Sequence, residues 1–129
     1  MTPEWLNDSV RAFGRQLGLG SLTLNERGSA GVRFENGVAL MFEYAADSLF
    51  VSVRVKAEPT EENLKVLLGE SHPSARTGLR QAVRAAYLEK AGEAMYVVRM
   101  GAREASVPAL EGVFRALWTL AARFGRSVS

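Results

Sequence analysis

Apolar and polar residues alternate along three consecutive runs between Gly28 and Lys56, and this pattern predicts a β-meander. Side chains two positions apart lie on the same side of a strand, so each run places its apolar residues on one face. That face would carry Val32, Phe34, Val38, Leu40, Phe42, Tyr44, Leu49, Val51, Val53 and Val55. One side of the meander is therefore expected to cover a core.

Two short turns fix the register of these strands. A three-residue loop over 35–37, with Gly37 in the left-handed conformation, pairs Phe34 with Val38 and keeps apolar residues opposite one another. A two-residue Asn-Gly loop would turn charged side chains onto the apolar face, so we prefer the longer loop. A four-residue loop over 45–48 forms the second turn. It gives the pairs Tyr44 with Leu49, Phe42 with Val51 and Leu40 with Val53.

The opposite face of the meander mixes charged residues with two large apolar ones, Met41 and Phe50. These two are expected to be covered by another part of the chain or by a partner, unless they are ordinary exposed apolar residues. The full set on this face is Arg33, Ala39, Met41, Glu43, Phe50, Ser52 and Arg54.

An amphipathic helix is predicted near the N-terminus. Thr2 is placed to cap this helix, and Gly18 and Gly20 are placed to end it. The residues from Leu22 to Leu24 then form a short extended piece before the meander. The apolar stripe of the helix consists of Leu6, Val10, Phe13 and Leu17.

Two further helices follow the meander. One begins after Pro59 with Thr60 as its cap, and the other begins at Ser106. The first of these is short and carries the apolar residues Leu64, Leu67 and Leu68. The last has a wide apolar face made of Leu110, Val113, Phe114, Leu117, Leu120, Ala121 and Phe124.

The stretch from 79 to 101 admits two interpretations. Local propensity favours a helix as far as about Glu89. Yet small and apolar residues alternate through 83–88, Gly92 offers a turn, and 95–100 is a clear strand that needs a neighbour. We therefore predict a two-strand hairpin.

The expected order is helix, three strands, helix, two strands, helix. This order is typical of an α+β fold, with an antiparallel sheet and helices packed against it. The 129 residues, of which 47% are hydrophobic, suit a single domain over 1–129. There is no cysteine for a disulfide. The N-terminus lacks an apolar signal and charges interrupt the last apolar stretch, so neither export by the general pathway nor a membrane span is expected.

Charge is distributed unevenly along the chain. The formal net charge is +2, but residues 73–129 contain nine basic and four acidic residues. This half could attract a polyanion or an acidic polypeptide, although a solvated arginine-rich surface is the commoner outcome. The alternative function is a nucleic-acid-binding module, which would use Arg76, Arg80, Arg84, Arg99 and Arg103.

No catalytic constellation is recognisable in the sequence. We find no paired carboxylates in an apolar setting, no nucleophile with a base, and no cluster of metal ligands. The one histidine, His72, precedes a proline in a turn-rich stretch without other ligands nearby, so no metal site is expected. An enzyme is the less favoured class, and a small-ligand domain would require a concave pocket with convergent polar groups.

Several local patterns add to this order of elements. Residues 13–43, FGRQLGLGSLTLNERGSAGVRFENGVALMFE, look like the first helix, the leucine-glycine-leucine exit, the acidic-glycine turn and the first hairpin of one family. The pairs Leu67-Leu68 and Thr77-Gly78 and the aromatic-rich last helix continue the match. The chain resembles the class I type III secretion chaperones, the Tir-chaperone-like family, over nearly its whole length.

The resemblance implies a role in bacterial virulence. A cytoplasmic homodimer would bind the N-terminal chaperone-binding segment of a secreted effector and keep it extended for secretion, with no cofactor and no small-molecule substrate. The family is usually acidic, whereas this chain has a pI near 9.3. This departure could mean a divergent member, an acidic effector partner or a heterodimer with an acidic sister subunit. Effector contacts would come from Leu22, Leu24, Met41 and Phe50, and dimer contacts from Leu64, Leu67, Leu68, Tyr96 and Val98.

Overall fold

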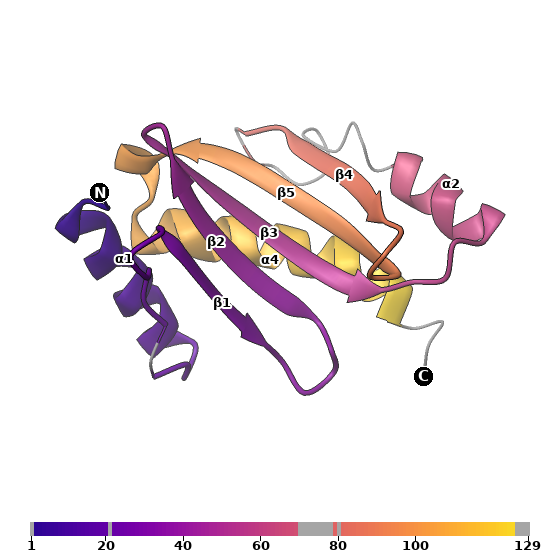
Figure 1. Ribbon diagram of the computed structural model, residues 1–129, viewed down its shortest axis with the longest axis horizontal. Helices are drawn as coiled ribbons and strands as arrows, with labels where there is room; N and C mark the ends of the chain where they lie inside the picture. Colours follow the sequence, from indigo (N-terminus) through magenta and orange to yellow (C-terminus); the bar gives the residue numbers. More distant parts are fainter. Residues whose placement is uncertain (1, 21, 70–78, 80, 126–129) are drawn as a thin grey trace.

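The computed structural model describes residues 2–20, 22–69, 79 and 81–125. Within these residues three helices and five strands follow one another in the predicted order (Figure 1). The helices are α1 (Glu4–Gln16), α2 (Glu61–Gly69) and α4 (Val107–Gly125), with a short 3-10 turn η1 (Ala102–Glu104) before α4. The strands are β1 (Ser29–Arg33), β2 (Ala39–Ala45), β3 (Ser48–Lys56), β4 (Val83–Leu88) and β5 (Glu93–Gly101). The predicted α+β class is confirmed.

The five strands form one antiparallel sheet in the order β1-β2-β3-β5-β4, so β1 and β4 are its edges. Helix α4 runs across one face of the sheet against β3 and β5, and α1 packs beside α4 (Figure 1). Helix α2 lies beyond the end of β3 and contacts β4. No described helix covers the opposite face, which we call the open face of the sheet.

The first hairpin has the predicted three-residue loop. Gly37 adopts a φ of 88°, and the amide of Phe34 donates a hydrogen bond of 2.8 Å to the carbonyl of Val38. Val32 lies opposite Leu40 in the ladder. The apolar residues of β1 and β2 therefore face the same side, as the pattern of alternation requires.

The second turn is tighter than predicted. The predicted pairs, such as Tyr44 with Leu49, are present, but Ala45 also pairs with Ser48, so the four-residue loop is wrong. The loop is only Ala46 and Asp47, with φ values of 50° and 59°. Two residues with positive φ make the turn whose twist suits an antiparallel hairpin, although glycine or asparagine usually occupies such positions.

Tertiary contacts hold this unfavourable turn. The carbonyl of Asp47 accepts a hydrogen bond of 2.9 Å from the amide of Ala102, and its carboxylate accepts one of 3.0 Å from the hydroxyl of Tyr44. Desolvation, this hydrogen bond and the negative charge of Asp47 raise the pKa of the Tyr44 phenol. A pattern of apolar residues encodes neither the long-range contact of Asp47 with Ala102 nor its local hydrogen bond with Tyr44. This explains why the pattern predicted a loop longer than the one observed.

The hairpin of β4 and β5 is confirmed over the competing helix. Gly92 makes the turn with a φ of 64°, and its amide donates to the carbonyl of Leu88. Val83 and Val98, which lie opposite one another, are both buried beneath the sheet. Burial of these alternating residues outweighs the helix propensity of the segment, because propensity amounts to less than about 1 kcal/mol per residue.

Two of the three predicted helix caps are confirmed. The amide of Asn63 donates to the Thr60 hydroxyl at 3.1 Å, and the amide of Ala109 donates to the Ser106 hydroxyl at 3.2 Å. Thr2 is not the cap of α1: Pro3 has that position, and no side chain caps the helix. The carbonyl of Pro3 accepts the first helical hydrogen bonds, so the helix starts one residue later than predicted.

The C-terminal end of α1 is a Schellman motif. Gly18 has a φ of 77°, its amide donates to the carbonyl of Arg15, and the amide of Leu19 donates to the carbonyl of Gly14. Leu17, which was expected in the apolar stripe, is instead the C-cap residue and is 37% exposed. The chain leaves the helix axis at this point, so the stripe ends one turn earlier.

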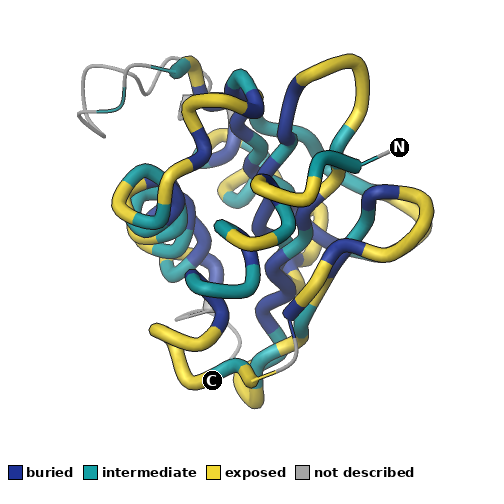
Figure 2. The backbone as a smooth tube through the Cα atoms, turned by 90° about the vertical axis from the view of Figure 1, so that its left-hand side faces the viewer, coloured by how far each residue is buried: buried dark blue, intermediate teal, exposed yellow. Residues whose placement is uncertain are grey.

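The core lies between the sheet and the two helices α1 and α4. Figure 2 shows the buried backbone positions gathered there, with exposed positions at the turns and on the outer sides of the helices. Phe13 of α1 contacts Phe42 of β2 edge-on, with ring centroids 5.8 Å apart. The ring of Tyr96 on β5 contacts that of Phe124 on α4 at 6.2 Å. Aromatic contacts thus tie both helices into the core.

Candidate functional site

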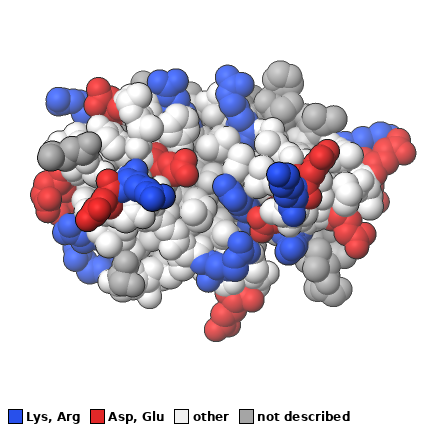
Figure 3. All heavy atoms as spheres, in the orientation of Figure 1, with Lys and Arg blue, Asp and Glu red and all other residues white. Residues whose placement is uncertain are grey.

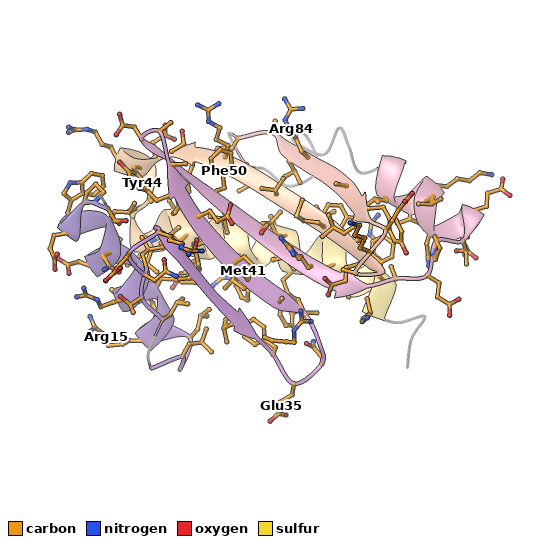
Figure 4. The ribbon with its side chains drawn as sticks, in the orientation of Figure 1. Arg15, Glu35, Met41, Tyr44, Phe50 and Arg84 are labelled. Atoms are coloured by element: carbon orange, nitrogen blue, oxygen red, sulfur yellow. The ribbon has the colours of Figure 1, made fainter. Side chains whose placement is uncertain are left out.

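The open face of the sheet carries Met41 and Phe50, as predicted (Figure 4). Both side chains are half-buried, and they are diagonal neighbours on β2 and β3 because Met41 lies opposite Ser52. The guanidinium of Arg99 lies 6.0 Å from the centroid of the Phe50 ring, and its Nε donates to the hydroxyl of Ser48 at 3.0 Å. Methionine and a stacked aromatic ring give this face an adaptable apolar area.

An ion pair occupies the other end of the open face. Arg33 on β1 reaches Glu93 on β5 at 3.4 Å, across the width of β2 and β3. Arg33 also donates to the carbonyl of Gly37 at 2.6 Å, which fixes its guanidinium. Figure 3 views this face and shows charged groups of both signs around uncharged areas. Met41 and Phe50 therefore lie on an accessible part of the face away from this ion pair.

A second apolar surface lies where α1, the β1–β2 loop and α4 meet. A pocket of about 460 Å³ is lined by Leu17, Phe34, Phe114 and Trp118, together with Arg115 and Thr119. We call it the aromatic pocket. The Phe34 ring stands edge-on to the Trp118 indole with centroids 5.1 Å apart, and Phe114 contacts Trp118 at 5.4 Å. The rings are thus fixed against one another before any ligand binds.

Local sequence explains how the aromatic pocket forms. Phe114 and Trp118 are one turn apart on α4 and therefore share a side of the helix. Phe114 also touches Phe13 of the core at 5.9 Å, so the pocket is anchored to the interior. Sequence reasoning assigned Phe34 and Phe114 to the core and gave Trp118 no role. The sequence signal that could have revealed this pocket is the aromatic stripe on α4, which is wider than the core requires.

The predicted effector contacts Leu22 and Leu24 have buried side chains. They are 6% and 5% exposed and belong to the core. The amide of Leu24 donates to the side-chain oxygen of Asn7 at 3.0 Å, which holds this segment against α1. Their apolar alternation reflects packing within the chain, so their side chains offer a partner little surface.

Three of the predicted dimer contacts also face inwards. Leu67, Tyr96 and Val98 are buried in the described fold, and Tyr96 points toward α4. Tyr96 and Val98 therefore have little side-chain surface for a partner in the described fold. Leu64 is half-buried on α2 and keeps some accessible surface, whereas the side chain of Leu68 lies outside the described residues.

The described structure places three of the five arginines that were proposed for nucleic-acid binding. Arg84 is exposed on β4 and points away from the sheet, whereas Arg99 is engaged with Phe50 and Ser48 (Figure 4). Arg103 is exposed in η1, and Arg76 and Arg80 lie outside the described residues, as does His72. Among the described residues no three potential ligands cluster around a metal site, and none of the helices could span a membrane.

Comparison with protein families decides the identity. The family model described as "Tir chaperone protein (CesT) family" matches residues 9–124. The chain belongs to this family. The resemblance to the Tir-chaperone-like proteins, predicted from core and turn patterns, is confirmed, and the family is one of chaperones and not of enzymes. A search of curated proteins gave no match.

Solved structures with the same fold are also similar to this chaperone. A chain of the ExsC-ExsE complex aligns with a TM-score of 0.76 at 20% identity, covering 95% of this chain and 92% of that chain. The HopA1-SchA chaperone-effector complex gives 0.71 at 18% identity, covering 92% and 91%. The Yersinia pestis type III secretion chaperone SycH, in complex with a fragment of YscM2, gives 0.70 at 19% identity, covering 92% and 98%. These likenesses support the fold.

Proposed function

We propose that this chaperone binds an extended segment of a secreted effector and keeps it competent for type III secretion. Family membership carries the proposal, because the matched model covers residues 9–124 and describes a chaperone family. The similar structures are complexes of chaperones with effectors or other protein fragments, which supports a polypeptide ligand. On this proposal the chaperone acts in the cytoplasm as a single domain, without catalysis.

The aromatic pocket is the surface best suited to the effector. Phe34 follows β1 directly, and β1 is an edge strand of the sheet. A segment that adds to this edge as a further strand would direct alternate side chains toward the pocket. Backbone pairing contributes affinity whatever the sequence, and the rings of Phe34 and Trp118 then select an apolar side chain. Met41 and Phe50 remain proposed as a second contact area on the open face.

A homodimer is the second part of the proposal. Helix α2 contacts β4, and its half-buried Leu64 has surface left for a partner. Leu68 stays a proposed contact, whereas Leu67, Tyr96 and Val98 would support the interface from beneath. A dimer would carry two aromatic pockets and so offer a longer binding surface to an extended segment. A large contact area is needed because it must offset the entropy lost when that segment becomes ordered.

Co-expression tests this function. The chain would be produced with N-terminal segments of secreted effectors from the same organism, and complexes would be isolated by size-exclusion chromatography with light scattering. We expect one segment to form a stable complex that protects it from limited proteolysis. Circular dichroism of the same segment alone should show no independent fold. Failure of every such segment to bind would contradict the proposal.

A further inference from the structure

Three arginines surround the turn that ends α1. The aromatic pocket on one side of this turn includes Arg115, and a smaller hollow of about 180 Å³ on the other side is lined by Arg11, Arg15, Gly20, Leu22 and Thr23. No carboxylate is among the described residues that line either one. Leu17 of the Schellman turn lines the aromatic pocket, whereas Gly20 and Leu22, which follow the turn, line the smaller hollow.

The three arginines differ in how their charge is compensated. Arg11 is 3.2 Å from Asp8 and 3.7 Å from Glu4, and it donates to the Thr23 hydroxyl at 3.3 Å. Arg15 and Arg115 are exposed and have no ion pair with any described residue. Figure 4 shows Arg15 pointing away from the body of the molecule. Two positive charges therefore remain available to a ligand.

Nearby negative charge does not cancel these two arginines. The C-terminal end of a helix is equivalent to about half a negative charge, and the Schellman hydrogen bonds already use its last carbonyls. Glu35 follows Phe34 in sequence but points away from the molecule at the tip of its loop (Figure 4). Glu111, one turn before Arg115 on α4, makes no ion pair with it in the described structure and does not line the pocket.

We propose that the segment bound at the aromatic pocket carries an apolar anchor residue flanked by aspartate or glutamate. The inference rests on the proposed function and adds the chemistry of the ligand. The anchor enters between Phe34, Phe114 and Trp118, and the flanking carboxylates pair with Arg15 and Arg115 on the two sides of the α1 turn. Guanidinium groups bind carboxylates with two parallel hydrogen bonds, so they select acidic residues and not merely polar ones.

The contributions of the anchor and of the arginines to the binding free energy differ because the pocket is apolar and the arginines are exposed. An apolar side chain that leaves water in the pocket supplies most of the affinity, because exposed ion pairs contribute little each. The arginines mainly set which segments bind and how fast they associate at low salt. Reversal of both charges is therefore expected to weaken binding of an acidic segment by roughly tenfold at low ionic strength and by less at high ionic strength.

A displayed library of random twelve-residue peptides provides the test. Selections would use the purified chain, an Arg15→Glu/Arg115→Glu variant, and an Arg84→Glu control that reverses an exposed arginine on the opposite edge of the sheet. We expect the unaltered chain and the control to enrich acidic residues beside an apolar position, and the double variant to lose this preference. Selected peptides would then be synthesised and their Kd measured at low and high salt.

The outcomes separate this inference from the function beneath it. Peptides that lose binding to a Trp118→Ala variant but show no acidic preference would overturn the inference and leave the proposed function standing. Failure to recover any peptide with an apolar anchor would count against both. If the charge-reversed variant does not fold, the Arg15→Gln/Arg115→Gln variant serves instead, and an unchanged acidic preference in it would overturn the inference.

Discussion

The ring of Phe34 meets the indole of Trp118 at an interplanar angle of 83°, with the centroids 5.1 Å apart. Phe34 ends the first strand run of the meander, and Trp118 lies on the last helix. Their contact closes one wall of the aromatic pocket against Phe114. The proposed effector site thus depends on the docking of α4 beside the β1–β2 hairpin.

Trp118→Ala is expected to weaken binding of an effector segment by about 2 kcal/mol, roughly thirtyfold, because it removes a wall of the pocket. Isothermal titration calorimetry with the co-purified segment would measure the loss. Trp5→Ala is the matched control, since Trp5 is 47% exposed on α1 and does not line the pocket. Equal losses in the two variants would contradict the assignment of the pocket.

Gly14→Ala is expected to destabilise the fold by about 1–3 kcal/mol. A β-carbon on Gly14 would lie 2.7 Å from Cβ of Leu22 and 3.0 Å from the carbonyl oxygen of Leu19, so Leu19 and Leu22 must move. The gain in helix propensity, about 1 kcal/mol, offsets only part of this cost. Urea denaturation would measure the change.

Gly20→Ala is the control for that experiment. Nothing lies within 4 Å of a β-carbon at Gly20, and its φ is not positive, so stability should change little. A similar loss in both variants would show that the close approach at Gly14 is not the cause.

Ala46→Gly is expected to raise the free energy of unfolding by about 1 kcal/mol. Ala46 has a φ of 50°, a conformation that costs a residue with a β-carbon but not glycine. Thermal unfolding would report the gain as a higher Tm. Ala45→Gly should have the opposite effect. Ala45 is a paired strand residue, and glycine would make the backbone at this position more flexible.

Leu64→Glu is expected to convert the proposed dimer into a monomer by placing a charge in an apolar contact on α2. Light scattering of the unaltered chain should give a mass near twice 14.0 kDa at both low and high salt. Lys65→Glu on the exposed side of α2 should leave that mass unchanged. A monomer at both salt concentrations would contradict the homodimer and direct attention to a sister subunit.

Much of the fold follows from local rules in the sequence. The alternation within each strand, the loop glycine Gly37 and the caps Thr60 and Ser106 each depend on residues close by in the sequence. The same local patterns of core and turn supported the resemblance that the family model confirms. Apolar periodicity and turn chemistry are physical requirements of the backbone, so they can be recognised without the tertiary structure.

The tertiary structure decided which apolar residues are accessible. Leu22, Leu24 and Tyr96 have the same pattern as exposed contact residues, yet the docking of α1 and α4 buries them. The same docking leaves Trp118 and Leu17 lining the aromatic pocket. Periodicity states which residues share a face but not which body that face meets, because burial depends on contacts between segments distant in sequence.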